Sequence, residues 1–156
     1  MTTVDRSQLI RDNRWISIQM EQWVNRTLEP VGLTAAQSSI LLHVLNQGEE
    51  GTSLTAIHRA FGYSMPTLSG MLKRLREKGY LRVEPCADDD RCKKLLGTEK
   101  GRRLRRELEE RSRQMEERLY SCFTSQELRD LDALQRKLLG HLSILTDERR
   151  KETMRS

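Results

Sequence analysis

A mainly α-helical fold with a small β wing is predicted by three features of this 156-residue sequence. Apolar residues recur every three or four positions over most of the chain, which is the period of an α-helix. The stretch 80–96 differs, because two extended, partly alternating runs flank a polar tip, as in a β-hairpin. Helix-capping residues mark the predicted helix starts, namely Thr34 with Gln37, Ser64, and Thr124 with Glu127.

The composition indicates one polar, helical domain that pairs with a second copy of itself. Charged residues make up 33% of the chain and aromatic residues only 4%, so few large apolar side chains are available for a core. The net charge of +5 agrees with a polyanionic partner but does not require one. No run is long or apolar enough for a signal peptide or a membrane span. We therefore expect a cytoplasmic protein with no membrane partner.

Helices at both ends of the chain, residues 1–30 and 101–147, form the predicted dimerisation region. Asp5 or Ser7 can cap the first helix, which runs to about Leu28. Its approximate inward stripe consists of Leu9, Ile16, Met20, Trp23 and Leu28. A long charged helix is predicted from Thr98 to about residue 123, with apolar residues along one side.

The last predicted helix carries a leucine stripe, six leucines spaced by threes and fours: Leu128, Leu131, Leu134, Leu138, Leu142 and Leu145. Such a continuous apolar stripe needs a partner surface, which the N-terminal helix can supply. We therefore predict a homodimer built from the two terminal regions. The alternative is packing within one chain.

Between the terminal helices, residues 34–100 are predicted to form a winged helix-turn-helix lobe. A supporting helix with Ile40, Leu41, Val44 and Leu45 comes first, and a short helix over residues 53–61 follows. A tight turn then leads to a helix from Ser64 to Lys78, which Gly79 ends. This helix has small residues on its outer face near its start and cations further on, so its N-terminus can approach an anionic surface closely. An ordinary amphipathic surface helix is the alternative.

The block from Leu54 to Gly101 resembles the MarR family of bacterial transcription regulators. The similarity lies in the spacing SxPTxSxxLxRLxxKGYL, in Asp89-Asp90-Arg91 and in the TEKG that follows. The resemblance implies a winged helix-turn-helix dimer, a DNA-binding function without enzymatic activity, and release by a small aromatic or anionic effector. Two positions depart from the family pattern, Cys86 where an acidic residue is frequent and Gly97 where an aliphatic residue usually ends the strand.

The charges of the wing indicate how it would meet DNA. Asp89 and Arg91, two positions apart, can lie on one face of the hairpin, and we predict that the Asp89 carboxylate holds Arg91. A held arginine loses less rotamer freedom when it enters a narrow minor groove. Lys93 and Lys94 would then lie near phosphates. A solvated turn without a binding role is the alternative.

The predicted partner is double-stranded DNA with a palindromic operator, read by two recognition helices about 34–36 Å apart. The predicted DNA-binding residues are Ser64, Pro66, Thr67, Ser69, Lys73, Arg74, Asp89, Arg91 and Lys93. Effector-binding residues cannot be assigned, although the resemblance and approximate position bring Trp15, Gln19, Trp23, His43 and His58 into consideration. The resulting hypothesis is a sequence-specific repressor that needs no cofactor or metal.

The cysteines suggest an alternative, a thiol-based redox-responsive regulator. Cys86 and Cys92 flank the wing tip, and Cys122 lies late in the long helix. Three scattered cysteines do not predict a disulfide framework, so incidental thiols are the simpler interpretation. A metal site lacks convincing ligand spacing. An enzyme has no supporting motif, whereas a helical protein-interaction module without DNA binding stays open as the other alternative.

Overall fold

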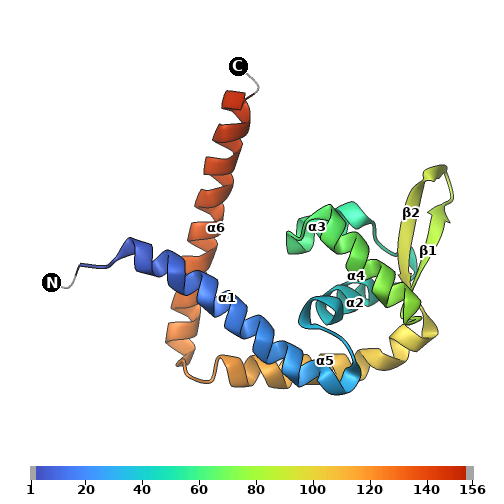
Figure 1. The fold of residues 1–156 in the computed structure, drawn as a ribbon, viewed down its shortest axis with the longest axis horizontal. Helices are drawn as coiled ribbons and strands as arrows, with labels where there is room; N and C mark the ends of the chain where they lie inside the picture. Colours follow the sequence, from blue (N-terminus) through green and yellow to red (C-terminus); the bar gives the residue numbers. More distant parts are fainter. Residues whose placement is uncertain (1–2, 154–156) are drawn as a thin grey trace. The chain divides into compact units, whose positions relative to one another are not determined.

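The structure, a computed structural model, describes residues 3–153, including all of their side chains except those of Asp90 and Glu152. In chain order the elements are α1 (Arg6–Leu28), η1 (Glu29–Val31), α2 (Ala35–Asn46), η2 (Gly48–Glu50), α3 (Leu54–Phe61), α4 (Met65–Glu77), β1 (Leu81–Cys86), β2 (Asp89–Gly97), α5 (Glu99–Leu119) and α6 (Ser125–Thr153) (Figure 1). The chain divides into two compact units, one ending at Met115 and the other beginning at Glu116. The predicted mainly α-helical fold with a small β wing is confirmed.

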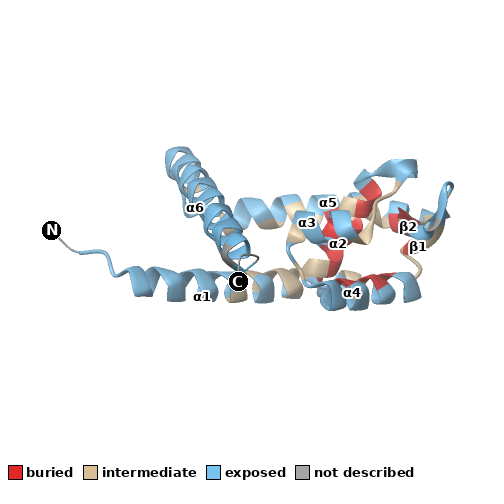
Figure 2. Cartoon of the chain, turned by 90° about the horizontal axis from the view of Figure 1, so that it is seen from above, coloured by how far each residue is buried: buried red, intermediate tan, exposed pale blue. Residues whose placement is uncertain are grey.

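The core of the first unit lies in α2, α3, α4 and the hairpin, with contributions from the end of α1 and from α5. Buried residues gather in this part of the chain in Figure 2. The core cluster consists of Leu28, Leu33, Ile40, Leu41, Val44, Leu45, Ile57, Leu68, Leu72, Leu75, Leu81, Leu95 and Leu108. The apolar side predicted for the supporting helix is thus buried in full, as are the three leucines of α4.

The predicted helix starts are confirmed by their capping contacts. Asp5 accepts hydrogen bonds from two N–H groups of the first turn of α1. Thr34 and Gln37 form a reciprocal capping box at α2, which satisfies two N–H groups that a helix start otherwise leaves without partners. Ser64 accepts from the Thr67 N–H at the start of α4. At the other end of α4, Gly79 has a φ of 80°, a left-handed conformation that glycine adopts without a Cβ clash.

The hairpin is longer than predicted. The expected polar tip covered residues 86–92, but β1 continues to Cys86 and β2 begins at Asp89, so only residues 87 and 88 form the turn. The register pairs Leu81 with Gly97 at the base and becomes irregular after Pro85, where β2 contains extra residues. A bridge between Thr52 and Leu95, with N–O distances of 3.0 and 2.7 Å, ties the hairpin to the loop before α3. This bridge holds the wing beside the helix-turn-helix.

Gly97 is explained by close packing. A Cβ built on it would collide with the Leu45 side chain of α2, so the aliphatic residue usual at this position would need Leu45 to move. Gly101 is more constrained, because its Cβ would lie 2.5 Å from the Tyr80 backbone oxygen. Backbone atoms cannot yield as a flexible side-chain end can.

Gly101→Ala is therefore expected to destabilise the protein by about 2 kcal/mol, because alanine overpacks a buried backbone contact. The matched control is Gly70→Ala in α4, where a Cβ meets nothing within 4 Å. There the higher helix propensity of alanine should stabilise by about 0.5–1 kcal/mol. Chemical denaturation of both variants checks this. Equal effects of the two substitutions would contradict the predicted backbone contact.

The terminal helices expose large apolar side chains. In α1, Leu28 is buried and Met20 and Trp23 are half-buried, but Leu9 and Ile16 are exposed, so only the C-terminal part of its predicted stripe packs in the first unit. In the second unit, Thr124 and Glu127 form the predicted capping box at the start of α6. The Thr124 backbone N–H and hydroxyl keep the pKa of the Glu127 carboxyl below its usual value.

The leucine stripe of α6 is also largely exposed. Leu134, Leu138, Leu142 and Leu145 keep 64%, 49%, 48% and 46% of their surface accessible. Figure 2 shows α6 as exposed along nearly all of its length, and Leu131 is half-buried. The long helix α5 ends at Leu119, a few residues earlier than predicted. Within residues 3–153, no helix combines the length and apolar character that crossing a membrane requires.

Candidate nucleic-acid interface

The start of α4 is a surface of small side chains. Pro66, Thr67, Ser69 and Gly70 are all exposed, whereas Leu68 is fully buried. The Ser64 hydroxyl donates to Thr67 Oγ1 at 2.8 Å and accepts from the Thr67 N–H at 3.3 Å, which fixes this first turn. The N–H groups of a first helical turn and the positive end of the helix dipole favour an anion placed there.

Cations follow along the same helix. Lys73, Arg74 and Arg76 are exposed, and the Lys73 ammonium lies 4.0 Å from the Glu77 carboxylate. This ion pair is exposed to solvent on both sides, so it holds Lys73 only weakly. The cations of α4 are therefore free to reorient towards phosphates.

A cationic cleft of about 750 Å³ lies between α4, the start of α3 and the hairpin. It is lined by Ser53, Leu54, Thr55, Ser69, Leu72, Lys73, Arg76, Val83, Pro85, Arg91, Cys92, Lys93 and Leu95. Its lining includes the buried Leu72 and Leu95 and four exposed cations, and none of these lining residues is Asp or Glu. Such a surface is electrostatically complementary to a phosphate backbone.

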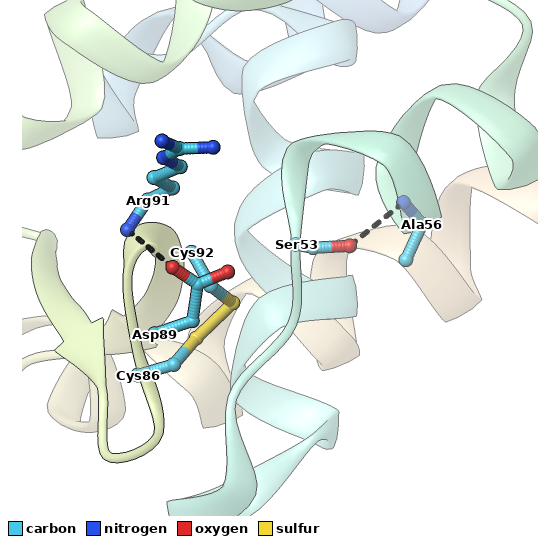
Figure 3. Close-up of a disulfide and its surroundings, with 6 residues drawn as sticks. All are labelled: Ser53, Ala56, Cys86, Asp89, Arg91 and Cys92. Carbon is cyan, nitrogen blue, oxygen red and sulfur yellow. Dashed lines mark hydrogen bonds between the residues drawn. A yellow bond between two sulfur atoms is a disulfide. The ribbon is translucent and has the colours of Figure 1, made fainter.

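The structure corrects the predicted role of Asp89. Its carboxylate accepts from the Arg91 backbone N–H at 2.9 Å, while the Arg91 side chain extends away from it (Figure 3). No ion pair joins Asp89 to the Arg91 guanidinium in the described part of the wing. A carboxylate two residues before an N–H can close a tight local turn, and that geometry directs it to the backbone rather than to the longer side chain. Asp89 therefore shapes the loop that carries Arg91 and leaves the guanidinium exposed.

The cysteines of the wing are joined, contrary to the expectation of incidental thiols. Cys86 and Cys92 form a disulfide across the hairpin, with their Cα atoms 5.3 Å apart (Figure 3). The irregular register brings the two residues together, because β2 contains extra residues opposite Cys86. The sequence separation alone could not show this. Cys122 is a free, exposed cysteine.

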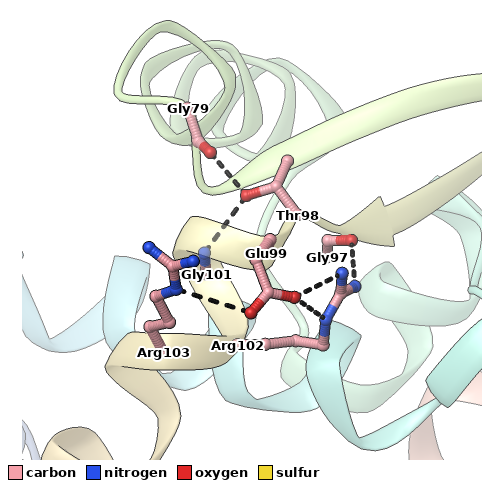
Figure 4. A network of polar contacts seen from close by, with 7 residues as sticks. All are labelled: Gly79, Gly97, Thr98, Glu99, Gly101, Arg102 and Arg103. Carbon is pink, nitrogen blue, oxygen red and sulfur yellow. Dashed lines mark hydrogen bonds and ion pairs between the residues drawn. The ribbon is translucent and has the colours of Figure 1, made fainter.

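The arginines at the start of α5 are occupied by local contacts (Figure 4). Arg102 donates to Glu99 Oε2 at 3.0 and 3.2 Å and to the Gly97 carbonyl at 3.1 Å, and Arg103 pairs with Glu99 Oε1 at 3.4 Å. Hydrogen bonding and charge from Arg102 lower the pKa of the Glu99 carboxyl, with a smaller contribution from Arg103. Thr98 Oγ1 donates to the Gly79 carbonyl at 2.5 Å. These contacts join the end of β2 to α5 and favour a structural role for this cluster.

The family model that matches this chain is that of the MarR family, and it covers residues 31–91, the helix-turn-helix and most of the wing. Among solved structures, the chain is similar to Staphylococcus aureus MepR in a complex with DNA, with a TM-score of 0.78 at 26% identity over 89% of this chain and 99% of that one. It also matches a MarR transcriptional regulator from Methanosarcina mazei Go1, with a TM-score of 0.75 at 18% identity over 89% and 99% of the two chains. A third match is a MarR protein from Peptoclostridium difficile, with a TM-score of 0.78 at 17% identity over 91% and 92%.

Residues 31–91 of this chain match the MarR family, and the chain as a whole is similar in structure to MarR-family regulators. The last two similarities, below 25% identity, show the shared winged-helix fold. The predicted resemblance is confirmed over residues 54–91 of the segment from which it was inferred, and the TEKG motif lies beyond the matched residues.

Within this winged-helix fold, the predicted DNA-binding residues of α4 are all exposed on the surface of that helix. Three of the predicted cations line the cationic cleft. These three are Lys73, Arg91 and Lys93. Arg74 and Asp89 are exposed but do not line the cleft. Sequence analysis missed Arg76, although it follows Lys73 by three positions and so lies on the same side of the helix. It also missed Ser53 and Thr55, which only the packing of α3 against α4 brings to the cleft.

The residues considered for an effector site do not meet at the cationic cleft. His43 packs edge-on against Phe61, with ring centroids 5.4 Å apart, and His58 Nδ1 lies 2.6 Å from the Tyr63 carbonyl oxygen. Burial, and to a lesser degree the Glu21 charge, raises the pKa of the Tyr63 hydroxyl. His43 thus packs against the end of α3, and His58 contacts the turn between α3 and α4. Trp15 is 60% exposed on α1 and Gln19 is exposed, whereas Trp23 is half-buried.

The described residues contain no group of three or more histidine, cysteine or acidic side chains arranged to hold a metal ion.

Proposed function

We propose that this MarR-family chain is a homodimeric, sequence-specific DNA-binding transcriptional regulator that acts as a repressor and is released by a small-molecule ligand. The observation that carries the proposal is the cationic cleft, where cations of α4 and of the wing converge beside the small-residue start of α4. MepR, a structural relative at 26% identity, has been crystallised in a complex with DNA.

The two parts of the lobe would read different grooves. The start of α4, with Ser64, Pro66, Thr67 and Ser69, is slim enough to enter the major groove and to bring hydroxyl groups to base edges or phosphates. Lys73, Arg74 and Arg76 would bind phosphates beside that groove. Arg91, exposed at the wing, would enter the minor groove, where the negative potential attracts arginine.

The dimer would form through the terminal helices. The leucine stripe of α6 and the exposed Leu9 and Ile16 of α1 are apolar surfaces that one chain does not cover. Their burial against a second chain would remove this surface from water, which is the main driving force for association. Two recognition helices about 34–36 Å apart would then read two half-sites of a palindrome.

Release would require a ligand that prefers one spacing of the recognition helices. A ligand shifts such an equilibrium only by its differential affinity for the two arrangements. The effector expected from the family resemblance is small and aromatic or anionic. Repression of genes in the cytoplasm is part of the same proposal.

Selection of bound sequences from a random duplex pool, followed by fluorescence anisotropy, tests the DNA-binding proposal. We expect enrichment of a palindrome with half-sites about one helical turn apart. Its affinity should fall on the order of 10³-fold between 50 and 200 mM salt, because phosphate-bound cations release counterions. A scrambled duplex of equal length is the control. Equal binding to both duplexes would contradict sequence readout, and no binding to either would favour the protein-interaction module.

A further inference from the structure

We propose that Cys86 and Cys92 form a reversible dithiol–disulfide switch that sets the affinity of the wing for DNA. The inference rests on the proposed DNA-binding function, since its output is the position of Arg91. It narrows the redox alternative considered from the sequence, which left Cys86, Cys92 and Cys122 open, to the bonded pair in the wing.

The disulfide closes the loop that carries Arg91. The ladder pairs Pro85 with Lys93 and Cys86 with Asp89, so residues 90–92 have no opposite residue in β1. Arg91 is in the middle of this extra segment. The Cys86–Cys92 bond and the hydrogen bond from the Arg91 N–H to Asp89 hold this segment in place. The disulfide thus connects this segment to β1, where hydrogen bonds of the ladder are lacking.

The position of the pair suits reversible chemistry. Cys92 is exposed and lines the cationic cleft, so small oxidants and reductants can reach it. The thiolate is the nucleophilic form of a cysteine. A protein that meets DNA in a compartment rich in thiol reductants keeps a disulfide only transiently, and disulfides there are usually regulatory.

A hydroperoxide is the proposed oxidant, and a dithiol is the reductant. The Cys92 thiolate attacks the peroxide oxygen and breaks the O–O bond, which gives a sulfenic acid and one equivalent of water or alcohol after protonation. The Cys86 thiolate then attacks the sulfur of the Cys92 sulfenic acid and forms the S–S bond. The hydroxide of the sulfenic acid leaves, takes up a proton and becomes water. The two sulfurs lose two electrons and the peroxide gains them. A dithiol reverses the bond by thiol–disulfide exchange and becomes a disulfide itself.

Reduction should loosen the segment around Arg91 and weaken DNA binding. Without the crosslink, the bulged segment samples more conformations, and these must be lost again when Arg91 enters the groove. We expect the reduced wing to bind roughly three- to tenfold more weakly, which is the cost of ordering one long side chain with its loop. By linkage, bound DNA should make the disulfide harder to reduce by the same factor.

The test uses the full-length Cys122→Ser chain, which removes the free exposed cysteine, and the palindromic duplex enriched by the selection above. Anisotropy titrations compare the protein treated with hydrogen peroxide and the protein treated with dithiothreitol, and mass spectrometry checks the bond by the loss of two hydrogens. The control is the Cys86→Ser/Cys92→Ser/Cys122→Ser chain. It should bind like the reduced protein under both treatments. Reduction equilibria with and without the duplex provide the second measurement.

The switch is supported if reduction weakens DNA binding and the control variant binds equally well after both treatments. Equal affinity of the oxidised and reduced proteins, or failure of peroxide to form the bond, overturns it while the DNA-binding function stands. Failure to bind any duplex in either state overturns the DNA-binding function and the switch with it.

Discussion

Arg91→Ala is expected to weaken binding to the selected palindrome by on the order of 10- to 100-fold, without unfolding the protein. Arg91 is exposed in a segment without a paired residue in β1, so removal of its guanidinium should leave folding intact. Loss of one specific arginine contact typically costs about 1–3 kcal/mol, and tenfold in affinity corresponds to about 1.4 kcal/mol. Anisotropy at several salt concentrations measures the effect, and the salt slope should fall by about one for each protomer.

Arg129→Ala is the matched control for Arg91→Ala. Arg129 is an exposed arginine of α6 that donates to the Gln126 side chain. Its replacement removes one positive charge, as Arg91→Ala does, but at a position outside the wing. It should leave the affinity and the salt slope nearly unchanged. If the two variants bind DNA equally well, the wing does not contact DNA as proposed.

Leu138→Glu is expected to dissociate the dimer and with it to abolish specific binding of the palindrome. Leu138 lies within the leucine stripe of α6 and is 49% exposed in the single chain. A carboxylate placed in an apolar interface loses its hydration without gaining a partner. The dimer dissociation constant should rise by at least on the order of a hundredfold. Sedimentation velocity measures the association, and anisotropy measures the loss of two-site binding.

Ile144→Glu serves as the control for the dimer. Ile144 is 57% exposed on the same helix, but it lies two positions after Leu142 and so faces another side. This variant should remain dimeric and bind the palindrome. A Leu138→Glu protein that stays dimeric would place the interface elsewhere, and dissociation of both variants would show only that α6 tolerates no added charge.

The helix-turn-helix was predictable because its signals are local. Ser64, Pro66 and Gly79 bound a helix by backbone chemistry that depends on a few neighbouring residues. Leu68, Leu72 and Leu75 recur at the helical period and are all buried in the structure. The exposed outer face of α4 follows from the same period. The local capping boxes at Thr34 and Thr124 were found in the same way.

The wing was predicted less well, because its details depend on strand register. Asp89 and Arg91 were expected to meet through their side chains, but the tight turn directs the carboxylate to the backbone N–H. The disulfide arises from extra residues in β2, and no periodic pattern in the sequence shows where a bulge will form. Arg76 was overlooked because only the packing of the wing beside α4 places it in the lining of the cationic cleft.

The sequence by itself determined the order and the capped starts of the helices, the buried side of the central ones and the apolar stripes of the terminal ones. These properties follow from helical periodicity and capping, which act over distances of a few residues. Only the tertiary structure decided that the cations of α4 and the wing line one cleft, that Gly97 and Gly101 must lack a side chain, and that Cys86 bonds to Cys92. The physical reason is that each of these depends on a contact between segments whose spacing is set by packing and register, not by local chain geometry.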